Sequence, residues 1–184
     1  MSDFVQGLTW EDQPVGFAFR TPGRTVTEHD LMAFVTLGGF NEPLFLDATY
    51  VEQHTPYTGR LIPGALTYTL AEGLVIQTHV IHGTGIAFLH MDLDVKAPVY
   101  VGDTLSVVVE VTECRPASKG GRGLVTTRNS VRNQRDEEVL VYTPVRLLRG
   151  GLTSTALLYI AVSVVTWLLA VWNSATDIDG IGLV

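Results

Sequence analysis

Two ionisable side chains within the irregular stretch 40–60 have the chemistry of an acid–base pair. Glu42 lies among apolar neighbours, and His54 ends a short stretch, 48–54, that is predicted to be helical. A carboxyl group and an imidazole that meet at a substrate can move protons to and from it. Glu42 could equally be a solvated loop carboxylate or the partner of Arg60. The sequence therefore offers Glu42 and His54 as candidate catalytic residues, without fixing the distance between them.

A backbone amide at a predicted helix start could bind a developing negative charge. Pro63 and Gly64 open a helix predicted over 63–77, and proline is well suited to the first helical turn. The amide of Gly64 has no partner within such a helix and lies at the positive end of its dipole. It could therefore donate a hydrogen bond to an oxygen that gains negative charge during a reaction. A glycine that packs closely and binds no ligand is the alternative.

Two other groups of residues indicate no separate site. His90, Asp92 and Asp94 share one face of a strand predicted over 86–96. Three such residues span about 13 Å, because a strand rises roughly 3.3 Å per residue, so they cannot converge on one metal ion. We therefore predict no metal site and expect this row to face solvent or another subunit. Cys114 is the single cysteine, which excludes an internal disulfide, fits a reducing compartment and is interpreted as a passive thiol.

The helices that must position the candidates carry clear boundary signals. Thr27 can cap a helix that Gly38 and Gly39 then stop. The helix over 63–77 is apolar on nearly all sides, as expected of a helix that forms the core of a domain. Its main apolar stripe consists of Leu66, Leu70 and Leu74. Its one acidic residue, Glu72, is interpreted as partly exposed.

Alternating hydrophobicity predicts strands over 86–96, 105–111, 124–132 and 139–147, with an earlier strand over 16–20. The inward-facing rows predicted for the first two are Leu89, Met91, Leu93 and Val95, then Leu105, Val107, Val109 and Val111. Antiparallel strands with one polar face predict an α+β domain whose sheet wraps a single buried helix.

Composition bounds the partners and the location. The formal net charge is −7 and the basic residues do not cluster, which argues against nucleic-acid binding. Residues 1–12 lack the features of a signal peptide. Residues 152–172 contain no charged side chain and are long enough to span a bilayer as a helix. With Arg146 and Arg149 flanking this stretch, the positive-inside rule predicts a cytoplasmic domain, 1–149, anchored by an apolar C-terminal tail, 150–184. A helix docked on the domain, or a tail foreign to it, is the alternative.

Four sequence blocks resemble the MaoC-like acyl-CoA hydratase/dehydratase family over residues 8–149. The blocks are GRTVTEHDLMAF at 23–34, GGFNEPLFLD at 38–47, GRLIPGALT at 59–67 and APVYVGDTL at 97–105. The resemblance implies a hot-dog fold, usually dimeric, and an enoyl or 3-hydroxyacyl thioester of coenzyme A as substrate. Coenzyme A would enter as part of the substrate, and no other cofactor is expected. Lys119, Arg122 and Arg128 could contact its phosphates, or could simply be solvated.

The resemblance also implies a catalytic pattern that this chain lacks. In the family, the aspartate and histidine of a G-D-x-N-P-x-H pattern transfer the protons. The ungapped match places Phe40 at the aspartate position, Glu42 at the asparagine position and Phe45 at the histidine position. Phenylalanine cannot transfer protons, so hydration by the usual mechanism is not expected. Phe40 and Phe45, with Pro63 and Gly64, are instead predicted to line a site that binds the thioester.

Three hypotheses follow for the function of the chain. The first is an acyl-CoA-binding hot-dog protein without a working acid–base pair, paired with itself or with a catalytic hot-dog subunit. The second is an active enoyl-CoA hydratase that uses other groups, such as Glu42 or His54. The third is a membrane-tethered binding module with no thioester ligand.

Overall fold

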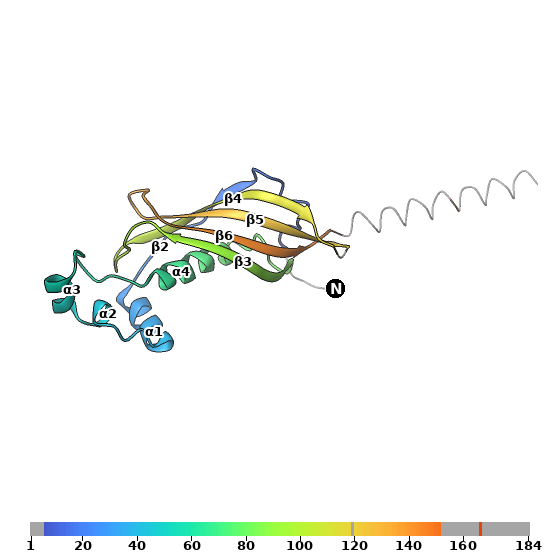
Figure 1. Ribbon diagram of the computed structural model, residues 1–184. Helices are drawn as coiled ribbons and strands as arrows, with labels where there is room; N and C mark the ends of the chain where they lie inside the picture. The colour runs from blue at the N-terminus through green and yellow to red at the C-terminus, as the bar shows by residue number, and fades with distance from the viewer. Residues whose placement is uncertain (1–5, 119, 152–165, 167–184) are drawn as a thin grey trace, which may run out of the picture.

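Four long antiparallel strands build the sheet, and two short N-terminal strands extend it (Figure 1). The structure is a computed structural model that describes residues 6–118 and 120–151, together with Thr166. The strands are β1 (Ala18–Arg20), β2 (Arg24–Thr25), β3 (Gly85–Val95), β4 (Thr104–Pro116), β5 (Arg122–Arg132) and β6 (Glu138–Arg149). Their order across the sheet is β1-β4-β5-β6-β3, and β2 pairs with β4. The predicted strands are confirmed, although the first is shorter than expected.

The helix α4 (Gly64–Gln77) lies along one face of this sheet (Figure 1). Its apolar stripe, Leu66, Leu70 and Leu74, is buried together with the inward row of β4. That row is Leu105, Val107, Val109 and Val111; the first three share one buried cluster with the leucines of α4, and Val111 belongs to a second cluster. Hydrophobic burial between these two elements dominates the core. The predicted antiparallel sheet curled around one long helix is therefore confirmed.

Three shorter helices precede α4, and Figure 1 shows them gathered beyond its N-terminal end. These are α1 (Glu28–Gly38), α2 (Pro43–Leu46) and α3 (Ala48–His54). The predicted cap of α1 is confirmed as a reciprocal capping box between Thr27 and Asp30. Burial raises the pKa of the Asp30 carboxyl, but hydrogen bonds from Thr27 and the charge of Arg24 outweigh it and hold this pKa below its usual value. Gly39, with φ of 69°, ends the helix in the left-handed conformation that favours glycine.

Most members of the inward row predicted for β3 are exposed, although Leu93 and Val95 lie opposite the core residues Tyr142 and Leu140 of β6 and so do face the helix side. Leu89 and Val95 are 55% and 57% exposed, Leu93 is also exposed, and Met91 alone packs against the core. β3 is an edge strand: it forms ladder hydrogen bonds with β6 along one edge, and no other described strand pairs with its second edge. A β-bulge between Phe88 and His90 also interrupts the alternation. The edge position therefore leaves apolar side chains at the surface.

The predicted transmembrane stretch, 152–172, lies outside the described residues apart from Thr166, so it stays a prediction. Within 6–118 and 120–151, no helix has the length and hydropathy that a bilayer crossing requires. One argument for the anchor needs correction. Arg146 does not flank the domain as a free cation, because its side chain is 8% exposed and points toward α4, where it pairs with Glu72.

Candidate functional site

The start of α4 provides the predicted backbone donor. Pro63 is the N-cap, and its carbonyl accepts hydrogen bonds from the amides of Leu66 and Thr67 at 2.9 and 3.1 Å. The Gly64 amide donates to no acceptor among the described residues. A Cβ at Gly64 would lie 3.0 Å from the Cγ2 atom of Val95 on β3. The absence of a side chain therefore lets the strand approach closely and leaves the amide uncovered at the positive end of the helix.

Phe40 and Phe45, two of the predicted substrate-binding residues, form one aromatic cluster with Phe34. The ring centroids of Phe34 and Phe40 lie 5.1 Å apart, and those of Phe40 and Phe45 lie 6.4 Å apart, edge to face. Both separations are typical of favourable aromatic pairs. A Cβ at Gly38 would lie 2.8 Å from the Phe40 ring, so this glycine makes room for it. Phe45 also packs against the core.

Arg60 fixes this cluster to α1. Its guanidinium donates to the Phe45 carbonyl at 2.9 Å and to both carboxylate oxygens of Glu28, at 2.6 and 3.2 Å. The hydrogen bond from Arg60 lowers the pKa of Glu28. The expectation that Arg60 might pair with Glu42 is therefore wrong, because Glu28, remote in sequence, takes that place.

The structure places Glu42 and His54 on the wall of the same open depression, of about 340 Å³. Both side chains are exposed, and the His54 ring lies 5.1 Å from the Tyr50 ring. No hydrogen bond joins Glu42 to His54 among the contacts of the described residues. The two side chains therefore share a cavity wall without forming a preassembled pair.

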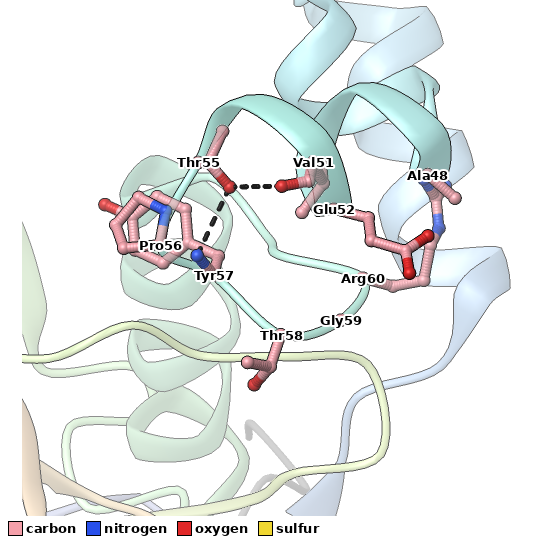
Figure 2. Close-up of a pocket in the computed structure, with 9 residues that line it drawn as sticks. All are labelled: Ala48, Val51, Glu52, Thr55, Pro56, Tyr57, Thr58, Gly59 and Arg60. Atoms are coloured by element: carbon pink, nitrogen blue, oxygen red, sulfur yellow. Dashed lines mark hydrogen bonds between the residues drawn. The ribbon is translucent and has the colours of Figure 1, made fainter.

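A second depression, of about 530 Å³, adjoins the first (Figure 2). It lies between α3 and the segment that leads to α4. Figure 2 shows the Thr55 hydroxyl bridging the turn, donating to the Val51 carbonyl at 2.7 Å and accepting from the Tyr57 amide at 3.2 Å. Arg60 lines it as well, and Thr55, Pro56 and Tyr57 line both depressions.

A buried polar group on α4 and β6 was not predicted. Both carboxylate oxygens of Glu72 accept from the Arg146 guanidinium at 2.7 Å, and one also accepts from the Tyr142 hydroxyl at 2.9 Å. The guanidinium carbon lies 5.6 Å from the centre of the Phe88 ring. Burial, reinforced by the Glu72 charge, raises the pKa of Tyr142 far above its usual value. A signal was present, because the alternation of β6 puts residues 142 and 146 on its inward face.

The remaining candidates lie apart from these features. Arg128 is exposed and pairs with Glu138 at 2.8 Å, Arg122 is exposed, and Lys119 lies outside the described residues. His90, Asp92 and Asp94 form an exposed row on β3. In the described part of the chain, no three His, Cys, Asp or Glu side chains are grouped as a metal site would require.

Comparison with known proteins identifies the family. Residues 11–134 match the family described as MaoC like domain. A 3-hydroxybutyryl-CoA dehydratase from Methylorubrum extorquens is 28% identical over 137 residues, which cover 74% of this chain and 85% of that protein. An R-hydratase structure from Pseudomonas aeruginosa superposes with a TM-score of 0.65 at 27% identity, covering 80% of this chain and 89% of that one.

A conserved Mycobacterium tuberculosis protein with a double hot-dog fold superposes with a TM-score of 0.71 at 25% identity. The match covers 80% of this chain and 46% of that one, so the chain corresponds to about one of its two units. The sheet and helix described above are thus a hot-dog fold, and the chain belongs to the MaoC-like hydratase/dehydratase family.

Proposed function

We propose that this protein binds acyl-CoA or enoyl-CoA thioesters without the proton-transfer pair usual in its family. The observation that carries the proposal is the packing of Phe40 and Phe45 into an aromatic cluster at the two positions where the family pattern has aspartate and histidine. Neither ring can accept or donate a proton. The M. extorquens relative is named for a CoA thioester substrate, which supports a ligand of that class.

The Gly64 amide supplies the thioester contact in this proposal. It lies at the positive end of α4 and no described residue takes its hydrogen bond, so it can donate to a thioester oxygen. Pro63 fixes the turn before it, and the Phe40 and Phe45 rings provide apolar surface. The site would bind the ligand and polarise its carbonyl, but it would not activate water.

A second hot-dog subunit, identical or different, would complete the assembly. Among the described strands, none pairs with the outer edge of β3, and this supports such pairing, since long uncovered edge strands readily add another strand. The double hot-dog protein of M. tuberculosis joins two such units in one chain. A catalytic partner of this kind would provide the acid and base that Phe40 and Phe45 cannot.

The test is a pair of measurements on the full chain, with crotonyl-CoA as the probe. We expect saturable thermal stabilisation by crotonyl-CoA, because a ligand that binds the folded state alone raises its stability, and no turnover above background. Free coenzyme A is the control for binding through the nucleotide alone. Hydration of crotonyl-CoA by the purified chain would contradict the loss of the acid–base pair, and a lack of response to every CoA thioester would exclude the binding role.

A restoration variant tests the same site from the opposite direction. Phe40→Asp combined with Phe45→His returns the two ionisable groups to the family positions. We expect measurable hydration of crotonyl-CoA by this double variant, because the Gly64 amide would still hold the thioester oxygen. Each single substitution serves as the control, since one group alone cannot supply both acid and base.

An active hydratase that uses Glu42 and His54 is the second candidate. The observation in its favour is their common place on the wall of one depression, where a bound substrate could bridge them. If this candidate is right, Glu42→Gln and His54→Ala each abolish a hydratase activity that the unmodified chain possesses. Glu52→Gln is the matched control, because Glu52 is an exposed carboxylate on α3, the helix that ends at His54, but it lines only the neighbouring depression.

A further inference from the structure

A half-open stripe of α4 faces the edge of the sheet. Gly64, Tyr68, Glu72 and Ile76 follow one another at intervals of four residues, so each is a surface neighbour of the next, in a line that turns gradually around the helix. The first three are half-buried and Ile76 is exposed, in contrast to the fully buried leucine stripe. The stripe therefore forms one wall of a surface that begins at the Gly64 amide.

Apolar side chains of β3 form the other wall. In the ladder between β3 and β6, Phe88 lies opposite Arg146 and Leu93 lies opposite Tyr142. The side chains of Arg146 and Tyr142 both donate hydrogen bonds to Glu72 of α4. Residues directly opposite in a ladder share a face, so Phe88 and Leu93 lie on the helix side of the sheet. Both are exposed, as is Val95, which borders Gly64. An apolar strip thus runs between α4 and β3 from Gly64 toward Ile76.

The Glu72–Arg146 ion pair interrupts this strip. The side chains of Glu72 and Arg146 are 18% and 8% exposed. Every other ion pair of the described residues has at least one side chain that is more than 18% exposed. The two groups satisfy each other, with further bonds from Tyr142 and to Thr127. An apolar chain that covered the pair would remove its remaining water and offer no hydrogen bond in return.

We infer that the Glu72–Arg146 pair sets the maximum length of the acyl chain that this protein accepts. The inference rests on the proposed function, with the thioester oxygen at the Gly64 amide and the chain lying in the strip. Glu72 is eight residues beyond Gly64, about 12 Å along the helix axis. An extended chain advances about 1.2 Å per bond, so a saturated acyl chain meets the pair after about ten carbons. Short and medium acyl chains fit, and longer ones must displace or cover the charges.

A series of saturated CoA esters tests the inference on the full chain, by isothermal titration calorimetry below the concentrations at which the esters form micelles. We expect affinity to increase roughly tenfold for each two methylene groups from butanoyl-CoA to decanoyl-CoA, as expected for methylene burial. For dodecanoyl-CoA and hexadecanoyl-CoA the affinity should level off or fall. A continuous increase up to hexadecanoyl-CoA would overturn the inference.

A double variant then tests the residues themselves. Glu72→Leu with Arg146→Met replaces the pair by apolar side chains of similar size, which often preserves stability. We expect hexadecanoyl-CoA to bind this variant at least tenfold more tightly than it binds the unmodified chain, with butanoyl-CoA unchanged. The matched control is Glu113→Leu with Arg115→Met, an exposed pair on β4, which should leave the length profile unaltered. An identical profile in the Glu72/Arg146 variant would exclude the pair as the determinant.

The outcomes separate this inference from the proposed function. Binding of CoA esters with no dependence on chain length would overturn the length limit alone and leave the proposed function standing. Failure to bind any CoA ester would overturn the proposed function and the inference together. If the double variant does not fold, the profile of the unmodified chain still decides.

Discussion

Removing the Glu72 charge should destabilise the domain strongly, because the substitution leaves a buried guanidinium uncompensated. Glu72→Gln retains the size of the side chain and one acceptor oxygen, but it loses the charge and one of the two hydrogen bonds from the Nη2 atom of Arg146, whose side chain is 8% exposed. Breaking a buried pair costs about 3–5 kcal/mol. Since Glu72 is still 18% exposed, we expect the lower end, about 3 kcal/mol, or a fall in Tm of roughly 6–12 °C for a domain of this size.

Urea unfolding followed by far-ultraviolet circular dichroism at neutral pH measures this loss. The Glu72→Leu, Arg146→Met double variant should recover most of this loss, because neither charge is then left unpaired; a residual cost of about 1–2 kcal/mol is expected from the buried Tyr142 hydroxyl, which loses its acceptor. Glu113→Gln, which breaks an exposed pair with Arg115, should cost at most about 1 kcal/mol. A double variant as unstable as Glu72→Gln would refute the reasoning, since the penalty would then arise from packing instead of charge.

Two further predictions concern the helix starts. Gly64→Ala should destabilise the domain by about 1 kcal/mol and weaken crotonyl-CoA binding, because the new Cβ would lie 3.0 Å from Val95. Gly73→Ala is the control: it has open space around it and should stabilise the domain by about 0.5–1 kcal/mol. Urea unfolding measures both changes in stability. Asp30→Ala removes the capping box with Thr27 and should cost about 1–2 kcal/mol at neutral pH. Because the folded-state pKa of Asp30 is lowered, its contribution is present above its unfolded pKa and lost as pH falls through the folded value, so the two chains should converge in stability below about pH 4. A difference that persists undiminished at acid pH would exclude the Asp30 charge as its source.

The elements that depend on local signals were predictable. The capping residue Thr27, the stop at Gly39 and the start of α4 at Gly64 all follow from preferences that act within a few residues. The inward row of β4 followed from alternation alone, because β4 is an inner strand with neighbours on both sides. Local chemistry therefore defined the helices and most of the sheet.

The features that failed depend on which elements become neighbours. β3 shows the same alternation as β4, but Leu93 and Val95 are exposed because β3 is at the edge, and Leu89 lies in a β-bulge; alternation reports neither strand order nor bulges. The Arg60–Glu28 contact joins residues 32 positions apart. The Glu72–Arg146 pair joins residues 74 positions apart, although the inward place of Arg146 on β6 was present in the pattern. Contacts across such distances require the fold to be known first.

The contact between Gly38 and the Phe40 ring constrains how this pocket could have evolved. A methyl group at position 38 would lie 2.8 Å from that ring and push it away from Phe34. A residue larger than glycine at 38 therefore conflicts with the present placement of the Phe40 ring, so the two positions are coupled. A smaller side chain at 40 would remove this restriction at 38, whereas any change at 38 alone must move the ring.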